Sequence, residues 1–195
     1  MRPLILASQS PRRQQLLKQA GFEFAVLPSK ISEIPNKNLN IDEQILDIAR
    51  QKAKTIFSKL EQENHFPCLI LAADTEVVID NKTLGKPESP DQAFGMLKRL
   101  SNDRHEVKTA VVLLLFPEAK MVTHLETTQV LFKNLPDSLI HNYIATGSPF
   151  DKAGGYGIQD DAGQDFILKY EGLYSNIIGL PIEKIPELLQ QLDVL

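Results

Sequence analysis

The sequence predicts an α/β protein with a mixed β-sheet flanked by helices. Short apolar runs typical of buried strands alternate along the whole chain with segments of helical periodicity. Two long apolar segments, residues 105–116 and 121–132, are separated by only a few residues around Pro117, which predicts an antiparallel hairpin. We therefore expect one domain, residues 1–195, that is long enough to bury a core without disulfides.

The expected elements alternate in type along the chain. In order, they are a strand at 4–7, a helix from 11, a strand at 22–26, a helix at 42–60, a strand at 68–73 that continues extended at 77–79, a helix from 90, strands at 105–116 and 121–132, a helix at 136–145, a strand at 166–170 and a helix from 185.

The helices are predicted from capping residues and from apolar stripes at helical spacing. Ser10–Pro11 and Ser89–Pro90 each offer an N-cap serine followed by proline in the first helical position. Asn40 and Glu43 are spaced as a capping box for the long helix. Gly21 is placed to end the first helix.

The strands are predicted from alternating or continuous apolar residues between turn residues. Residues 22–26 alternate, residues 68–73 are almost wholly apolar, and Asp80–Asn81 predicts a turn. Cys68 is the only cysteine and begins an apolar run, so we expect a buried structural thiol rather than a nucleophile.

Composition and charge exclude several classes of protein. The net charge of −4 argues against binding nucleic acid or an anionic membrane, which needs a basic surface. The longest uncharged apolar stretch, residues 110–116, is too short to span a bilayer, and the N-terminus lacks the features of a signal peptide. We expect a cytoplasmic protein without a membrane partner. An anionic small ligand would need a local cluster of Lys and Arg.

The first segment with chemical potential is LASQSPRR, residues 6–13. A strand end, a tight loop and a helix N-terminus present free backbone N–H groups there. Arg12 and Arg13 lie in the first helical turn, where cations are least favourable, so a bound anion would explain them. A capped helix with solvated arginines is the alternative.

Two further segments carry single charged residues. Asp74 follows a buried strand, at the position where α/β folds place ligands, and suits metal binding or proton transfer from water. An aspartate that caps a turn is the alternative. Lys86, between Gly85 and Pro87, suits a phosphate contact, although exposed loop lysines are common.

The fourth segment is a glycine-rich loop at residues 151–159. Its three glycines allow the backbone to pass close to a ligand, with Lys152 at one end. Tyr156 is placed to stack on a base and Gln159 to read one through its amide. A flexible turn is the alternative.

Glu33 in a loop and Lys52 at the edge of an apolar helical stripe are additional candidates, with a solvated lysine as the alternative for Lys52. The sequence has no zinc-like Cys/His spacing, no GxxxxGK[ST] loop and no G-x-S-x-G elbow, which argues against zinc sites, P-loop enzymes and α/β-hydrolases. Cations with one or two carboxylates are the equipment for metal-assisted attack on a polyphosphate.

The chain resembles the Maf family of nucleotide pyrophosphatases, which is named for an association with septum formation. The resemblance extends from Leu4 to the C-terminal helix. It is carried by five blocks in the family's order: LASQSPRR (6–13), AADT (72–75), LGKP (84–87), DKAGGYGIQ (151–159) and NIIGLP (176–181).

The resemblance implies a fold with two lobes around a deep cleft, similar to ITPase-like proteins, and a homodimer. It implies Asp74 as the proton acceptor, working with a divalent cation, Mg²⁺ or Mn²⁺, that Asp74 and Glu33 hold. The residues expected to bind the nucleoside triphosphate are Ser8, Ser10, Arg12, Arg13, Lys52, Thr75, Lys86, Lys152 and Gln159.

Members of the family divide by substrate. The type that cleaves dTTP and UTP carries arginine, threonine and glutamine at the places of Arg12, Thr75 and Gln159. The resemblance therefore favours dTTP and UTP, with modified pyrimidine nucleotides as further targets. The alternatives are a 7-methyl-GTP or broad-specificity pyrophosphatase, a phosphatase that releases single phosphates, and a nucleotide-binding regulator of septum formation without turnover.

Three places depart from the family's usual pattern. Asn102 stands where a glycine is usual, Ser148 stands where an acid is common, and Asp160–Asp161 follow Gln159 where a glycine is usual. We expect the added negative charge at Asp160–Asp161 to weaken phosphate binding or to alter the substrate preference.

Overall fold

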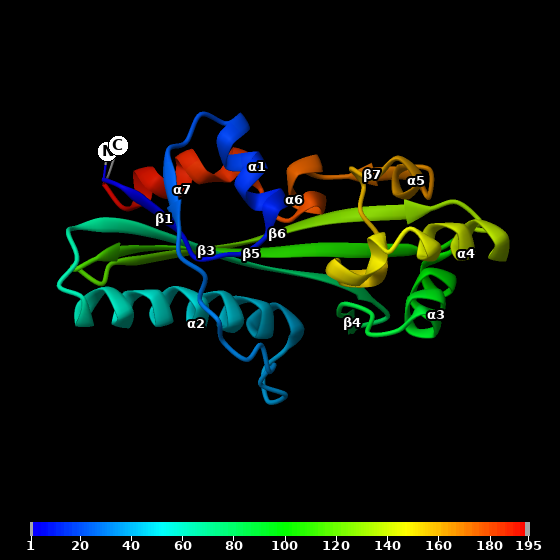
Figure 1. The fold of residues 1–195 in the computed structure, drawn as a ribbon, viewed down its shortest axis with the longest axis horizontal. Coiled ribbons are helices and arrows are strands. Elements are labelled where there is room, and N and C mark those ends of the chain that lie inside the picture. Colours follow the sequence, from blue (N-terminus) through cyan, green and yellow to red (C-terminus); the bar gives the residue numbers. More distant parts are fainter. Residues whose placement is uncertain (1, 194–195) are drawn as a thin grey trace. The chain divides into compact units, whose positions relative to one another are not determined.

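The structure is a computed structural model and describes residues 2–193. Within them, seven strands form one mixed sheet in the order β2-β1-β3-β5-β6-β7, with β4 paired to β3 (Figure 1). This confirms the predicted α/β class and the mixed sheet. The elements are β1 (Leu4–Leu6), α1 (Pro11–Gln19), β2 (Phe24–Val26), α2 (Ile41–Gln62), β3 (Cys68–Ile79), β4 (Lys82–Leu84), α3 (Pro90–Leu100), β5 (Arg104–Phe116), β6 (Met121–Phe132), α4 (Asp137–Ala145), α5 (Asp161–Gln164), β7 (Ile167–Glu171), α6 (Tyr174–Ile178) and α7 (Ile185–Gln191).

The chain divides into two compact units, and β3, β5 and β6 run through both. Unit 1 comprises Met1–Asp74, Thr109–Glu126 and Gly179–Leu195, and unit 2 comprises Thr75–Lys108 and Thr127–Ile178. The sequence predicts a single domain whose two lobes surround a cleft. That arrangement of the two units stays a prediction.

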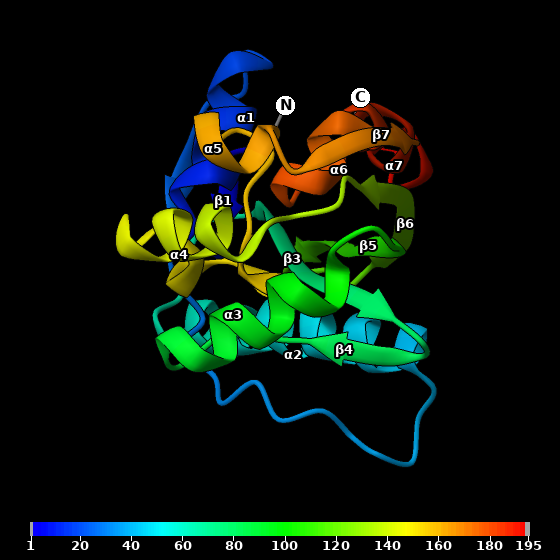
Figure 2. The same cartoon turned by 90° about the vertical axis from the view of Figure 1, so that its right-hand side faces the viewer.

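Unit 1 contains the parallel part of the sheet, with helices on both faces. β1 pairs in parallel with β2 and with β3. Helix α2 lies along one face of this sheet, and α1 and α7 lie on the other (Figures 1 and 2). The predicted capping box starts α2, since Asn40 Oδ1 accepts from the Glu43 N–H at 2.9 Å and Glu43 Oε2 from the Asn40 N–H at 3.2 Å. The apolar stripe of α2 is buried against β3 and β5, and Cys68 lies in the same core, as predicted.

The position of Asp74 within its strand differs from the prediction. We expected Asp74 at a strand end, but β3 continues through it to Ile79. The strand continues because Val77 and Ile79 bury their side chains in the core of unit 2 and pair with β4. The neighbouring strand β1, in contrast, stops at Leu6, opposite Leu71. Asp74 therefore lies beyond the carboxyl end of β1, which is the edge where α/β sheets place ligands.

Unit 2 packs α3 and α4 around the antiparallel part of the sheet, where β4 pairs with β3 and β7 with β6. The predicted turn at Asp80–Asn81 is confirmed, with φ values of 47° and 56°. Asn102 also has a left-handed φ of 56°. Asparagine is the residue that best replaces glycine in this conformation, so the departure at this place keeps the backbone geometry.

The expectation that Tyr156 stacks on a base is wrong. Tyr156 is only 5% exposed and lies in the core of unit 2. Its ring packs edge-on against Phe132, and its hydroxyl shares a 2.7 Å hydrogen bond with Nε2 of His105. The glycines before it allow the chain to turn, and the aromatic ring that follows anchors the loop to the core instead of facing a ligand.

His105 gives the fold a pH dependence. Burial lowers its pKa from 6.5 to about 4, because the charged imidazolium would lose its hydration. Between these values the unfolded chain binds more protons than the folded chain, so stability is lost as the pH falls. We expect the free energy of unfolding to be lower at about pH 5 than at about pH 7.5, by roughly 2 kcal/mol from this residue.

Urea titrations at the two pH values measure this loss. A His105→Gln variant, which retains a hydrogen-bonding side chain but takes up no proton, is the control and should show a flatter pH dependence. If the free energy of unfolding depends equally on pH in both proteins, the assignment to His105 is wrong.

No helix within residues 2–193 has both the length and the apolarity to cross a membrane.

Candidate active site

The centre of the candidate site is a buried ammonium group between two carboxylates in unit 1. Lys52 Nζ lies 2.7 Å from Asp74 Oδ1 and 2.9 Å from Glu33 Oε1. The side chains of Lys52 and Asp74 are each only 8% exposed, whereas that of Glu33 is 52% exposed. The structure therefore brings together three predicted site residues that are far apart in the sequence, and Lys52 is not the solvated lysine of the alternative interpretation.

The sequence explains why Lys52 is buried. It lies on α2 between Ala49 and Ala53, which are both fully buried against the sheet. Small side chains on either side leave room for the lysine stem to run along the apolar surface, while its charged end reaches Asp74. A buried ammonium is stable only with such partners.

Arg13 forms the second part of the site. Its Nε donates to Gly179 O at 2.8 Å, and its Nη1 donates to Ala73 O at 2.9 Å and to Ser8 Oγ at 3.2 Å. Ala73 lies beyond the end of β1, so its carbonyl has no partner on that strand and the guanidinium satisfies it. Arg13 thus ties α1 to the backbone beside Asp74, a structural role in addition to the predicted role in substrate binding.

The start of α1 is built as the sequence predicts. Ser10 Oγ accepts from the Arg13 N–H at 3.4 Å, and Ser8 Oγ accepts from the Ser10 N–H at 3.2 Å. Burial lowers the pKa of Arg13, an effect that the charges of Asp74 and Glu33 partly oppose. Arg12 lies two residues after the cap, in the first turn of α1, and is partly exposed.

Charges of both signs meet at the site in unit 1. Lys52 pairs with the two carboxylates, Asp74 and Glu33, and both carboxylates also act on the charge of Arg13. The N-terminus of α1, which is the positive end of its dipole, favours an anion beside these groups. Lys52 binds Oδ1 of Asp74, and within residues 2–193 the other oxygen of that carboxylate has no hydrogen-bond partner. A carboxylate that is held through one oxygen can accept a proton from water on the other.

Asp74 and Glu33 are also the residues that would hold a divalent cation. Both place an oxygen within hydrogen-bonding distance of the same nitrogen, so the pair can share a small cation. In the described part of the chain, no group of three or more His, Cys, Asp or Glu side chains has metal-binding geometry. Mg²⁺ is commonly bound by one or two carboxylates with waters and substrate phosphates, so the donor set fits a cation that arrives with a polyphosphate.

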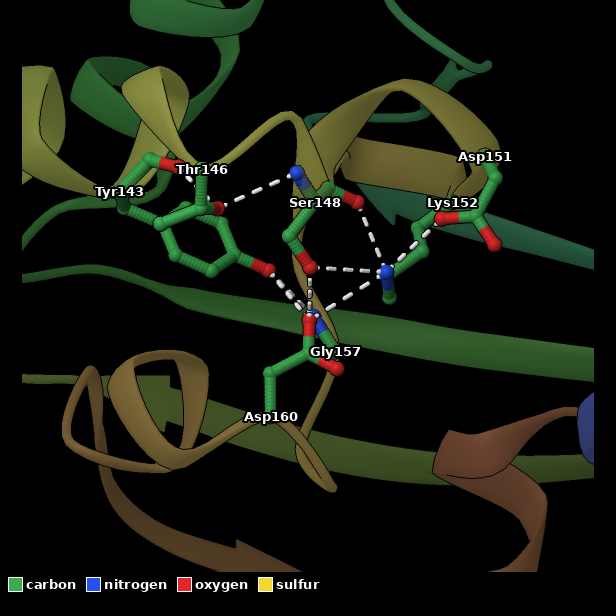
Figure 3. Close-up of polar contacts among 7 residues, drawn as sticks. All are labelled: Tyr143, Thr146, Ser148, Asp151, Lys152, Gly157 and Asp160. Atoms are coloured by element: carbon green, nitrogen blue, oxygen red, sulfur yellow. Dashed lines mark hydrogen bonds and ion pairs between the residues drawn. The ribbon is translucent and has the colours of Figure 1, made fainter.

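The predicted residues of unit 2 form a separate cluster around Lys152 (Figure 3). Lys152 Nζ donates to Asp151 Oδ1 and to Ser148 O, both at 2.7 Å, and lies 3.2 Å from Asp160 Oδ2. The two unusual residues Ser148 and Asp160 meet here, since Ser148 Oγ donates to Asp160 Oδ2 at 2.5 Å. The negative charge of Asp160 is therefore paired with Lys152.

The loop that carries Lys86 lies against the glycine-rich loop in unit 2. The N–H of Gly154 donates to Gly85 O at 3.0 Å. Gly154 has a φ of 68°, and a Cβ there would meet the Val77 side chain at 2.9 Å, so only glycine fits. Lys86 itself is exposed and makes no ion pair with any residue in 2–193.

Two of the expected specificity residues belong to unit 2. Gln159 is exposed, and its amide lies beside the Lys152 cluster, because a Cβ on Gly157 would meet Gln159 Nε2, Asp160 Oδ2 and the Lys152 side chain. Thr75 is half-buried on β3, directly after Asp74. Their predicted roles in nucleotide recognition stay predictions.

The sequence does not predict the contacts of three residues that adjoin these clusters. The carbonyl of Gly179 accepts from Arg13 Nε. Its φ of 123° favours glycine, but this angle is known only from the structure. Tyr143 donates to Asp160 Oδ2 at 2.7 Å, although in the sequence it is indistinguishable from the apolar face of α4. Ser148 donates to Asp160, a contact between residues twelve positions apart that only the folded chain forms.

Comparisons with known proteins identify relatives of this chain. A family model described as "Maf-like protein" matches residues 3–192. Similar curated proteins called dTTP/UTP pyrophosphatase come from Bdellovibrio bacteriovorus (50% identity, 98% of this chain and 100% of the relative), Halalkalibacterium halodurans (45%, 94% and 93%) and Caldicellulosiruptor bescii (42%, 98% and 96%).

Among solved structures, that of the Staphylococcus aureus Ham1 protein is similar over 97% of this chain and 90% of its own chain. Its TM-score of 0.45 and identity of 12% make this likeness too distant to bear on function. The family model spans nearly the whole described chain, and three relatives are 42–50% identical to it. By these two findings, the chain belongs to the Maf-like protein family.

Proposed function

We propose that this protein hydrolyses dTTP and UTP, and modified pyrimidine nucleotides of the same form, to the monophosphate and pyrophosphate. The observation that carries the proposal is the buried Lys52 between Asp74 and Glu33. The names of the three relatives and the presence of Arg12, Thr75 and Gln159 support the choice of nucleotide.

In the proposed reaction, Asp74 takes a proton from a water molecule through the oxygen that Lys52 does not bind. The water oxygen forms a bond to the α-phosphorus. The bond from that phosphorus to the oxygen bridging it to the β-phosphate breaks, and pyrophosphate leaves with the electron pair. Lys52 holds the Asp74 carboxylate in one orientation throughout.

Positive charge stabilises the transition state. The residues proposed to neutralise the phosphate oxygens are Arg12, Arg13, Lys52, Lys86 and Lys152, with Ser8 and Ser10 at the start of α1. Phosphoryl-type transfers depend mostly on positioning and electrostatic stabilisation, so these cations should contribute more than the base does.

A divalent cation, Mg²⁺ or Mn²⁺, is part of the proposal. Asp74 and Glu33 would hold it, and when bound it would draw negative charge from the phosphate oxygens. Lys52 binds the same two carboxylates. Its single positive charge therefore offsets one of their two negative charges when the cation is not bound.

A panel of nucleoside triphosphates tests the function. We expect pyrophosphate and monophosphate from dTTP and UTP, at a kcat/KM at least about tenfold above that for CTP, ATP, GTP and 7-methyl-GTP, since one positioned hydrogen bond to a base gives that discrimination. Preference for 7-methyl-GTP, or equal rates for all, would reject the pyrimidine specificity. Release of single phosphates, or binding without products, would reject the pyrophosphatase.

The homodimer, the cytoplasmic location and the lack of nucleic-acid and membrane partners stay predictions from the sequence and its family resemblance.

A further inference from the structure

Gly157 lies at the point where three side chains of the Lys152 cluster converge. A Cβ added to it would come within 2.6 Å of Lys152 Cε and within 2.9 Å of Asp160 Oδ2 and of Gln159 Nε2. Non-bonded carbon atoms pack best at about 3.5–4.0 Å, so there is no room for this Cβ. The ends of the three side chains therefore occupy the volume that any larger residue at position 157 would need.

The backbone conformation does not account for glycine at this position. Gly154 and Gly155, earlier in the same loop, have left-handed φ values of 68° and 73° that favour glycine. Gly157 lies outside the left-handed region. What excludes a larger residue at Gly157 is the set of side chains around it.

The backbone of Gly157 is held on both sides. Its N–H donates to the Tyr143 hydroxyl at 3.2 Å, and its carbonyl oxygen accepts from the Asp160 N–H at 3.1 Å. The same carbonyl packs against α5, because a Cβ on Gly163 would overlap it. A side chain at position 157 would therefore displace the surrounding side-chain ends rather than the backbone.

The Lys152 ammonium is held at this place by fixed groups (Figure 3). Its Nζ donates to Ser148 O at 2.7 Å and lies 3.2 Å from Asp160 Oδ2, which accepts from the Tyr143 hydroxyl at 2.7 Å. Burial alone would raise the pKa of Asp160, but the hydrogen bonds from Ser148 and Tyr143 and the charge of Lys152 outweigh it, and the pKa is lowered. The carboxylate is therefore kept charged beside Lys152.

We propose that Gly157 is a positioning residue, whose missing side chain lets the phosphate-binding Lys152 and the base-reading Gln159 meet at one place. The proposal rests on the function proposed above and extends it. In a nucleotide, the base and the α-phosphate are joined through a single sugar. Side chains that converge on one point can therefore contact both ends of that short unit.

Replacing Gly157 by alanine tests this role with a single methyl group. We expect KM for dTTP to rise about tenfold to 10²-fold, because a shift of about 1 Å in a substrate-binding group can cost that much. We expect kcat to change less than KM, since Asp74 and Lys52 in unit 1 keep their contacts. Selectivity for dTTP over CTP should fall about tenfold, because the Gln159 amide is displaced as well.

Two alanine substitutions in unit 2 serve as matched controls. Gly95→Ala adds the same methyl group on α3 in open space, and it should leave KM and selectivity unchanged. Gly163→Ala adds it against the Gly157 carbonyl, so the midpoint of urea denaturation should fall. In Gly157→Ala the methyl group meets only flexible side-chain ends. A loss of stability as large as that in Gly163→Ala would show that the backbone moves, and it overturns the proposal.

Binding of inorganic tripolyphosphate, measured by calorimetry, separates the phosphate contact from the base contact. Gln159→Ala should lose selectivity between bases but change the dissociation constant of tripolyphosphate less than about twofold, since this ligand has no base. Gly157→Ala should lose both, with a dissociation constant raised about tenfold. A folded Gly157→Ala protein that keeps either its tripolyphosphate affinity or its base selectivity overturns the proposal.

A measurement on the unaltered protein needs no folded variant of Gly157. The side-chain amide signal of Gln159 in the NMR spectrum is assigned by its loss in Gln159→Ala. It should shift when tripolyphosphate is added, because the phosphate bound by Lys152 lies beside this amide. An unmoved signal, whether tripolyphosphate binds elsewhere or not at all, overturns the proposal.

The same experiments distinguish this inference from the proposed function. If no nucleotide is hydrolysed, but tripolyphosphate shifts the Gln159 signal and binds more weakly to Gly157→Ala, the proposed function fails and the role of Gly157 stands. If dTTP and UTP are hydrolysed preferentially, but Gly157→Ala keeps the KM and the selectivity of the parent, the function stands and this inference fails.

Discussion

Replacement of Asp74 by asparagine is expected to lower kcat for dTTP by at least about 10²–10⁴-fold, the usual contribution of a positioned general base. The asparagine amide has nearly the same shape but takes no proton from water. A bound cation would also lose one of its two carboxylate ligands, so the loss should exceed that of proton transfer alone. The measurement is pyrophosphate release with Mg²⁺ or Mn²⁺ in excess.

The Asp74→Asn protein must be shown to be folded before its turnover is interpreted. Lys52 keeps Glu33 as a charged partner at 2.9 Å, so the fold should persist. Asp47→Asn is the matched control. It removes a carboxylate of unit 1 that accepts a hydrogen bond from Gln51, one turn along α2, and it should leave turnover unchanged. A folded Asp74→Asn protein with near-normal turnover would refute the role given to Asp74.

Replacement of Lys52 by methionine is expected to cost about 3–5 kcal/mol of stability, the range for breaking a buried ion pair from one side. Methionine retains the apolar stem against Ala49 and Ala53. It leaves Asp74, whose side chain is 8% exposed, without its charged partner. Urea denaturation measures the change, and dTTP hydrolysis should be lost together with the orientation of Asp74.

A double-mutant cycle distinguishes this cause from a packing defect. In Lys52→Met/Asp74→Asn the uncompensated carboxylate is gone, so the double variant should be more stable than Lys52→Met alone. If the second substitution adds to the destabilisation instead, the loss in Lys52→Met comes from packing, and the ion pair is not what stabilises the site.

The sequence predicts the elements of this fold well because their signals are local. The capping box at Asn40 and Glu43 and the serine caps at Ser10 and Ser89 each act within a few residues, and the structure contains all three. Periodicity likewise placed the apolar face of α2 against the core, since a helix must bury such a stripe somewhere.

The site was predicted less completely because its contacts are long-range. Tyr156 lies between Gly155 and Gly157 in a glycine-rich loop with a ligand-like pattern, yet its aromatic ring packs in a core that only the folded chain assembles. The continuation of β3 past Asp74 depends on β4, which has only three residues and no strong strand signal. The sequence predicts that Arg13 binds an anion, but it gives no indication of the hydrogen bonds from Arg13 to Ala73 and Gly179.

The residues that depart from the family's pattern illustrate the same limit. Taken alone, Asp160 adds a negative charge to the loop, and Ser148 replaces an acid that is common in the family. In the structure the two side chains touch, and both contact Lys152. A change in charge at one position is therefore interpretable only with the partner that folding brings to it.

The dTTP reaction of the nucleotide panel, run in water labelled with ¹⁸O, tests most directly whether this site activates water against the α-phosphorus. The account predicts one labelled oxygen in the thymidine monophosphate and none in the pyrophosphate. Label in the pyrophosphate, or in free phosphate, would show attack at another phosphorus and contradict it.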